Sequence, residues 1–467
     1  MMAAMAISAF ALMLLPAAAQ SPDIRWGEPG VLFDAGSGAR VFNPFVVPDP
    51  YGGVHVLWEV TTEGTQGESE YANGIYCVDG DGVTWSEPVD VIVDPAGSRT
   101  FWPQHAISDA GRLVVVWVGG NLQLYVSVTD AADACLARSW RTGVVAAAGQ
   151  VQNAAVAVDS EGALHVAYAA RGQAVYYIQS SDEGLSWSAP VAVSTARPDV
   201  ASAMPEIAVD ADGRIHVVWE EAQLPQGVPG LGVYYARSVD GGVSFEPART
   251  LADGKHTQPN VAALDDGTLH LFWNGRAGTQ GRYHQWSQDG GANWSPVLTI
   301  LAPGTGGGQT GAPRWAVDSS GALHLVTGTD NSDHVSWTGS AWGSGQNITA
   351  YDAFGNMEHQ NIGISRGREL HVVANASTVR IIYVRGVTDA PELPVATRSV
   401  TDGTPAPEPM TLSTPVSEAA VDRTVAAPMD SEPQSRDNAA LPFGLGALSA
   451  TAVLVAALVV ARSRSLR

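Results

Sequence analysis

The phrase "ADGRIHVVW" at residues 211–219 decides the fold, because variants of it recur along the chain. In each variant, residues typical of a tight turn precede alternating apolar residues typical of a strand. Aligned on His216, the copies are spaced by 47 residues (324 to 371) to 59 residues (55 to 114). This period predicts a β-propeller with one blade per repeat. The other copies are "PYGGVHVLW" (50–58), "DAGRLVVVW" (109–117), "SEGALHVAY" (160–168), "DDGTLHLFW" (265–273), "SSGALHLVT" (319–327) and "SRGRELHVVA" (365–374).

The number of blades follows from the strands in each repeat. Six repeats contain four strand-like segments, whereas the last contains three. The segment "RWGEPGVLF" at 25–33 is similar to the fourth strands "TWSEPVDVI" (84–92) and "SWSAPVAV" (186–193). We therefore predict an all-β propeller of seven four-stranded blades. In it, residues 24–33 pair with the strand at 379–385 and close the last blade, which leaves no free sheet edge.

A second phrase follows the first in most repeats: "SSDEGLSW" (180–187), "SVDGGVSF" (238–245), "SQDGGANW" (287–294) and a degraded copy, "VDGDGVTW" (78–85). It resembles the Asp-box of sialidases and related propellers, S-x-D-x-G-x-[ST]-W. Asp and Ser side chains bond the backbone of the turn, and the glycine takes a conformation that a Cβ disfavours. The resemblance covers about 24–386. Because known sialidases have six blades, six is the alternative count.

The two ends of the chain predict export and anchoring. Residues 1–19 read as a signal peptide ending in a small-x-small pattern. Residues 20–390 form the propeller, and 391–440, rich in Pro, Thr and Ser, form a disordered stalk. Residues 441–461 are uncharged and long enough to span a membrane, and the basic tail 462–467 stays inside. We expect an exported monomer anchored at the cell surface, although "LPFGL" (441–445) leaves a processed sorting signal as the alternative.

Composition excludes several functions. The formal net charge of -22 argues against nucleic acid as a partner. Lys255 is the one lysine, so lysine-based Schiff-base or phosphate chemistry is not expected, and we expect no cofactor or metal. Cys77 and Cys135 lack metal-binding spacing; they fall late in neighbouring repeats, and an exported protein is oxidised, so we expect a disulfide.

Candidate site residues are those that break the repeat. The repeated His and Trp, and the Asp-box carboxylates, occur in equivalent positions and are expected to be structural. The first strand of each blade lines the central channel, and the loops between second and third strands complete the binding face, opposite the Asp-box turns. The polar residues predicted to face a ligand there are Asn43, Gln104, Gln152, Glu206, Glu220, Gln258, Asn260, Arg276, Arg314 and Gln360.

These residues favour binding of an extracellular glycan at the channel mouth, with Glu206 and Arg314 at its centre. An arginine there could pair with the carboxylate of an acidic sugar. The resemblance implies an exo-sialidase or related glycoside hydrolase as one alternative, but the Arg-Ile-Pro phrase of that family is replaced by "FNPFVV" (42–47). A structural or protein-interaction module is the other alternative.

Overall fold

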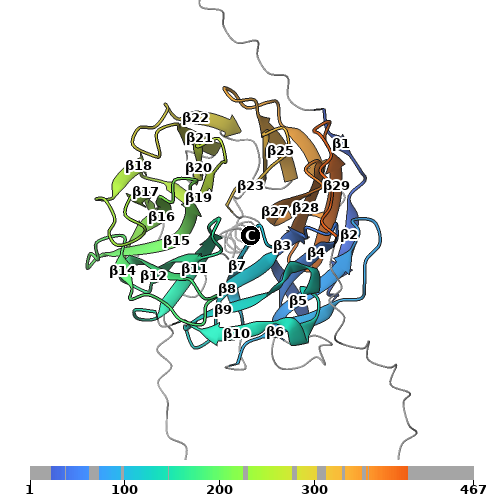
Figure 1. Cartoon of the computed structure of the whole chain (residues 1–467), viewed down its shortest axis with the longest axis horizontal. Coiled ribbons are helices and arrows are strands. Elements are labelled where there is room, and N and C mark those ends of the chain that lie inside the picture. The colour runs from blue at the N-terminus through green and yellow to red at the C-terminus, as the bar shows by residue number, and fades with distance from the viewer. Residues whose placement is uncertain are drawn as a thin grey trace, which may run out of the picture. The chain divides into compact units, whose positions relative to one another are not determined.

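The computed structural model describes residues 23–36, 38–62, 73–95, 99–145, 147–224, 230–275, 281–301, 312–328, 332–349, 354–355 and 357–397. Within these residues, seven antiparallel sheets are arranged in a ring (Figure 1). Each sheet is one blade, and its first strand lies nearest the centre. The predicted seven-bladed propeller is therefore confirmed, and the six-bladed alternative is wrong.

The blades follow one another in chain order. Blades 1 to 3 consist of β3 (Ala39–Pro48), β4 (Val54–Thr62), β5 (Gly74–Gly80) and β6 (Val89–Val93); β7 (Phe101–Ile107), β8 (Arg112–Val118), β9 (Leu124–Asp130) and β10 (Arg141–Val144); and β11 (Val151–Val158), β12 (Leu164–Ala170), β13 (Val175–Ser180) and β14 (Val191–Ala192). Two short 3-10 helices, η1 (Ala131–Asp133) and η2 (Ala137–Ser139), are inserted before β10.

Blades 4 to 6 consist of β15 (Val200–Val209), β16 (Ile215–Gln223), β17 (Gly230–Ser238) and β18 (Arg249–Asp253); β19 (His256–Ala263), β20 (Leu269–Gly275), β21 (Gly281–Ser287) and β22 (Leu298–Leu301); and β23 (Arg314–Val317), β24 (Leu323–Gly328), β25 (Ser332–Trp337) and β26 (Gln346–Thr349). Blade 7 consists of β27 (Met357–Ser365), β28 (Glu369–Ala376) and β29 (Arg380–Val387), completed by β1 (Arg25–Trp26) and β2 (Gly30–Asp34).

The amino-terminal segment closes the ring, as predicted. β1 pairs with β29 through Arg25 opposite Val387, and β2 pairs with it through Gly30 opposite Tyr383. The two ends of the propeller, far apart in sequence, therefore share one sheet (Figure 1). Trp26 also reaches the preceding blade, blade 6, where its indole N–H donates to Gln346 at 2.9 Å.

Apolar side chains between neighbouring blades form the core. The largest fully buried side chains include Trp58, Trp117, Trp219 and Trp273, one from the second strand of each of four blades. The repeated histidines are also buried; His216, for example, is bonded through Nε2 to Asp210 at 3.1 Å and through Nδ1 to the Tyr235 hydroxyl at 2.8 Å. These recurring residues hold the fold together, which agrees with the structural role expected for them.

The Asp-box turns have the expected geometry. Asp182 accepts hydrogen bonds from the backbone N–H of Ser186 at 2.8 Å and from the Ser180 hydroxyl at 2.7 Å. Gly184 has a φ of 80°, a conformation that disfavours side chains. The box aromatic packs on the preceding blade; the ring of Phe245 in blade 4 lies 5.4 Å from that of Tyr177 in blade 3. Each box therefore stabilises a turn and a blade interface together.

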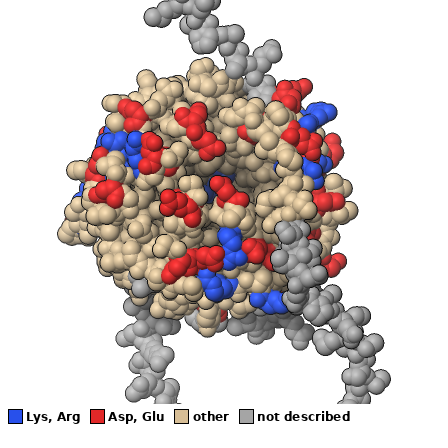
Figure 2. All heavy atoms as spheres, in the orientation of Figure 1, with Lys and Arg blue, Asp and Glu red and all other residues tan. Residues whose placement is uncertain are grey.

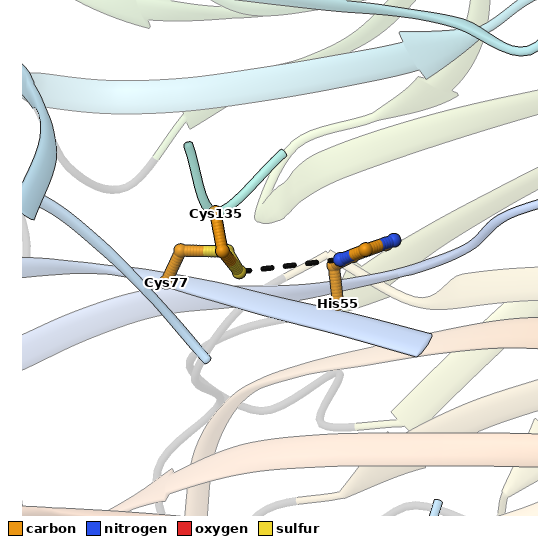
Figure 3. A group of neighbouring side chains, drawn as sticks. All are labelled: His55, Cys77 and Cys135. Atoms are coloured by element: carbon orange, nitrogen blue, oxygen red, sulfur yellow. Dashed lines mark hydrogen bonds between the residues drawn. A yellow bond between two sulfur atoms is a disulfide. The ribbon is translucent and has the colours of Figure 1, made fainter. Parts of the chain in front are cut away.

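A disulfide joins Cys77 and Cys135, as expected from the sequence, with their Cα atoms 5.2 Å apart (Figure 3). Cys77 lies in β5 of blade 1, and Cys135 lies between η1 and η2 of blade 2. The insertion that replaces the Asp-box of blade 2 thus carries the second cysteine across to blade 1.

Replacing both cysteines by serine is expected to lower the free energy of unfolding by about 4 kcal/mol, because the bond closes a loop of 58 residues. Urea unfolding of the variant measures the loss, and the wild-type protein treated with a dithiol should show the same midpoint as the variant. An unchanged midpoint in both would contradict a stabilising role for this bond.

The carboxyl-terminal residues that are described remain attached to the propeller beyond residue 390. The backbone N–H of Leu393 donates to the carbonyl of Arg366, and that of Ala396 donates to Pro50. Across the described part of the chain, no helix is long and apolar enough to cross a membrane. The predicted signal peptide (1–19), the rest of the stalk, the membrane segment (441–461) and the basic tail (462–467) lie outside the described residues.

Candidate functional site at the channel mouth

The inner strands share an unusual backbone feature in their first halves. Five of them contain a non-glycine residue with a φ between 46° and 52°, next to a shift in strand register: Asn43, Trp102, Met204, Gln258 and His359. This conformation costs about 1–3 kcal/mol per residue and occurs preferentially at functional sites. A β-bulge also re-aims the side chains that follow it. The channel mouth therefore contains a ring of strained residues.

Three side chains from alternate blades meet in the channel. The Arg314 guanidinium (blade 6) donates from Nη1 to Oε1 of Glu206 (blade 4) at 3.0 Å. It also donates from Nη2 to Oε1 of Gln104 (blade 2) at 3.0 Å. All three are half-buried on inner strands. We call Gln104, Glu206 and Arg314 the channel cluster; these predicted site residues are brought together.

The three positions are equivalent in the fold. Gln104 lies opposite Val116, Glu206 opposite Val218 and Arg314 opposite Val326 in the strand register. In blades 5 and 7 the same position holds asparagine. Asn260 donates to the Pro313 carbonyl at 2.9 Å, and Asn361 accepts from the Val46 N–H at 3.3 Å. Asparagine there connects neighbouring blades, whereas the channel cluster replaces that structural role with contacts across the channel.

Burial changes the protonation of groups in the channel. Burial raises the pKa of the Glu206 carboxyl, and the Arg314 charge opposes this shift. Burial, together with the Arg314 charge, lowers the pKa of His105 to about 3. The pKa of His359 is lowered to about 4 by burial, against a hydrogen bond to Asn375 that raises it. Both imidazoles are therefore neutral at pH 7, whereas Arg314 and Glu206 form an ion pair between the inner strands of blades 6 and 4.

Other predicted residues lie at the mouth but bond to protein. Asn43 donates to Glu59 at 3.0 Å, and Gln258 accepts from Asn274 at 2.9 Å. Glu220 accepts from the Thr257 hydroxyl and, at 2.7 Å, from the Gln258 N–H. These side chains shape the rim by tying strand ends together.

Two predicted ligand contacts correspond to buried structural residues. Asn260 and Gln360 are 4% and 3% exposed, and Gln360 donates to the Met357 carbonyl at 3.2 Å. Their side chains are used within the fold, Asn260 in a bond to the neighbouring blade and Gln360 in a bond to its own strand. Gln152 is exposed, and Arg276 lies outside the described residues.

Trp102 is a site residue that the sequence reasoning missed. It is half-buried, has a φ of 52°, and its ring meets that of His359 edge-on at 6.4 Å between centroids. It precedes Gln104 of the channel cluster by two positions. The available signal was a recurring X-Pro dipeptide at the start of inner strands: Asn43-Pro44, Trp102-Pro103, Met204-Pro205 and Gln258-Pro259.

Acidic side chains surround the channel on one face of the propeller. Figure 2 shows several Asp and Glu side chains around a central hollow on that face. The formal net charge of the chain is -22. A polyanion approaching this surface would be repelled, with the strength depending on salt.

Comparison with known proteins agrees with this architecture. A protein of unknown function from Dyadobacter fermentans has a TM-score of 0.52 and 16% identity, covering 78% of this chain and 99% of that chain. A family PL25 ulvan lyase, bound to -[GlcA(1-4)Rha3S]-, has a TM-score of 0.50 and 13% identity, covering 81% of this chain and 98% of that chain. At such identities the likeness is one of fold.

The sequence itself gives the family. No curated protein matches the chain. The family model of the BNR repeat-like domain matches residues 17–271, more than half of the chain. This chain therefore belongs to the BNR repeat-like domain family and is a sialidase-like Asp-box propeller with seven blades.

Proposed function

We propose that this propeller binds a hydroxyl-rich, uncharged glycan at the channel mouth through the channel cluster. The observation that carries the proposal is the sharing of the Arg314 guanidinium between Glu206 and Gln104, each at 3.0 Å. Two of the five guanidinium N–H groups serve these bonds. The others, the second Glu206 oxygen and the Gln104 amide place donors and acceptors side by side. Sugar hydroxyls donate and accept, so they match such a set.

The charge of the site favours a neutral sugar over an acidic one. Glu206 already neutralises Arg314, so a ligand carboxylate would have to displace a half-buried partner. The negative net charge of the chain adds long-range repulsion. The sequence led us to expect that Arg314 pairs with a ligand carboxylate. That pairing is therefore less favoured than hydrogen bonds from one uncharged sugar to both Arg314 and Glu206.

An aromatic surface beside the cluster supports the same ligand class. Trp102 lies half-buried at the mouth, in a left-handed conformation that is strained for a non-glycine residue. The C–H face of a pyranose packs on an indole ring while its hydroxyls reach polar groups, as in many small-ligand sites. Trp102 and Gln104 lie on the same strand, β7, so the aromatic side chain and a member of the channel cluster are two positions apart in the chain.

The cluster supports binding better than hydrolysis. Glycoside hydrolysis commonly uses two carboxyl groups about 5–10 Å apart. The channel cluster supplies one, that of Glu206, while Glu59 and Glu220 at the rim are engaged by protein donors. It also supplies one arginine, whereas the sialidase resemblance implies three.

The test is a glycan-array screen of the propeller followed by calorimetry on the best ligand. We expect Arg314→Gln, Glu206→Gln and Trp102→Ala each to weaken binding at least tenfold, about 1.4 kcal/mol. Arg141→Gln is the matched control: it removes the same charge near the Asp-box turn containing Glu183, away from the channel, and should bind normally.

Two results would contradict the proposal. One is full-strength binding by the Arg314→Gln/Glu206→Gln double variant, which removes both charges without leaving either unpaired. The other is selective capture of uronate or sialate glycans, with neutral glycans unbound; this result would restore the carboxylate-pairing interpretation of Arg314.

A further inference from the structure

The repeated histidines reveal a position where blade 1 differs from the others. In five other blades, Nδ1 of the repeated histidine is bonded, at 2.7 to 3.1 Å, to a side chain on the third strand. That side chain pairs in register with the residue two positions after the histidine. The third-strand partners are Tyr177, Tyr235, Tyr383, His284 and His334.

In blade 1 this position holds a cysteine. Cys77 lies opposite Leu57, two residues after His55, where other blades place tyrosine or histidine. The Cys77–Cys135 disulfide lies beside His55 (Figure 3). His55 therefore faces sulfur: its Nδ1 lies 4.0 Å from Sγ of Cys135. Nδ1 also lies 3.3 Å from Oδ1 of Asp79.

The orientation of the His55 ring is fixed through its Nε2 atom. Its Nε2 lies 3.0 Å from Oδ2 of Asp49, and both side chains are buried. In the tautomer that carries its proton on Nε2, His55 donates a hydrogen bond to Asp49, and its Nδ1 lone pair faces the sulfur of Cys135 and the carboxylate of Asp79. A carboxylate behind an imidazole in this way is the usual outer partner of a metal-binding histidine.

We propose that reduction of the Cys77–Cys135 disulfide converts this group into a Zn²⁺ site. The ligands are the two thiolates, Nδ1 of His55 and the carboxylate of Asp79. The candidate ligand atoms of His55, Cys77 and Cys135 lie within 4.8 Å of one another. Two thiolates, an imidazole and a carboxylate form a four-coordinate set that suits zinc.

The chemistry balances with an external dithiol as reductant. The dithiol gives two electrons and two protons; the S–S bond breaks, two protein thiols form, and the dithiol becomes a disulfide. Binding of Zn²⁺ then releases the two thiol protons to solvent. While the disulfide is intact neither sulfur is a thiolate, so disulfide and metal are mutually exclusive states of one site.

The reduced geometry is within reach of the side chains. Zn–S bonds of about 2.3 Å in a tetrahedral site require sulfurs about 3.8 Å apart. Cys135 is half-buried on the inserted segment between η1 and η2, and Asp79 is 56% exposed on its side chain. Rotation of the Cys135 side chain and movement of the Asp79 carboxylate toward His55 complete the coordination shell of the metal. Because both residues are partly exposed, the reductant and the ion can reach them.

The experiment titrates Co²⁺, a spectroscopic substitute for Zn²⁺, into the oxidised and the dithiol-reduced protein, with excess reductant removed under argon. We expect thiolate-to-cobalt absorption and tetrahedral d–d bands at one equivalent in the reduced protein, displaced by Zn²⁺, and no bands in the oxidised protein. Cys77→Ser/Cys135→Ser should abolish them. Asp79→Asn should weaken binding about tenfold, whereas the control Asp90→Asn, an exposed acid on β6 of the same blade, should not.

Three outcomes would overturn the proposal: no cobalt spectrum in the reduced protein, an equal spectrum in the double-serine variant, or loss of folded circular dichroism on reduction before metal is added. The last would show that the ligands are not held together without the disulfide. The proposal is further supported if zinc displaces cobalt without changing the far-UV circular dichroism spectrum.

Discussion

Deletion of residues 23–36 is expected to abolish cooperative folding of the propeller near room temperature. The segment supplies β1 and β2, which cover the outer edge of β29 and complete blade 7. It also buries Ile24 and Phe33, each 7% exposed, and Phe33 packs 4.9 Å from the ring of Trp58. Burying each of these side chains contributes about 2–3 kcal/mol. With the lost strand pairing, the total approaches the 5–15 kcal/mol that stabilises a typical domain.

Point variants separate ring closure from simple truncation. Phe33→Ala should cost about 3–4 kcal/mol, because it leaves a cavity between blades 7 and 1. Val31→Ala, on the same strand but 50% exposed, should change the stability by less than about 0.5 kcal/mol. Urea unfolding and size-exclusion chromatography measure both, and adding the peptide 23–36 to the deleted protein should restore the transition. A deleted protein with a wild-type midpoint would show that the ring holds without its closing strands.

The architecture could be predicted because each repeat contains the sequence signals that are typical of one blade. The turn, the buried strand ending in Trp219 or its equivalents, and the Asp-box recur at one spacing, so the repeats count the blades. The missing fourth strand of the last repeat then matched the leftover segment at 25–33. These inferences need the order of strands and the match between segments, and both are visible in sequence.

The site was only partly predictable, because side-chain direction in a bulged strand is not a property of composition. Gln104 and Gln360 are both glutamines near the start of an inner strand, yet one meets Arg314 and the other donates to a backbone carbonyl. The register shift after Trp102 and before Asn361 decides which residue faces the channel. The single charges Glu206 and Arg314 were found because no repeat needs them.

Trp102 shows what a composition-based search overlooks. Polarity does not single out Trp102, because an aromatic residue before a proline on an inner strand is equally compatible with core packing. Cys77 is a similar case. Its pairing with Cys135 was expected from compartment and position, but its replacement of a tyrosine in the histidine network becomes visible only when the strand registers are compared.

Acidification is expected to unfold the propeller in a range where most folded domains are still stable. Burial lowers the pKa of His270 to about 4 and of His371 to about 3. Burial and the neighbouring imidazole lower the pKa of His284 to about 2 and of His334 to about 3. All four are at most 3% exposed.

The sign follows from proton linkage. In the unfolded chain these imidazoles titrate near pH 6.5, so below that pH the unfolded state binds more protons than the folded state. The stability is fully present above pH 6.5 and is lost as the pH falls, until the pH reaches the lowered folded values. Each histidine contributes a slope of about 1.4 kcal/mol per pH unit, and four together approach about 5 kcal/mol per unit. Buried aspartates such as Asp210, whose pKa is lowered from 3.8 to about 2, contribute stability that is lost only below about pH 3.8, so between pH 6.5 and pH 4 the slope comes from the histidines.

The chain itself suggests the variant that tests this assignment. His334 bonds to Nδ1 of His324 at 3.1 Å, where blades 3, 4 and 7 use a tyrosine hydroxyl for the same bond. His334→Tyr should keep the bond to His324 and remove one titrating group, because a phenol stays neutral throughout this range. Urea midpoints measured between pH 8 and pH 5 should therefore fall less steeply in the variant, by about 1.4 kcal/mol per pH unit once the m-value is applied. A variant with the wild-type slope would mean that His334 does not take up a proton on acid unfolding, and would leave His270, His284 and His371 as the source of the acid sensitivity.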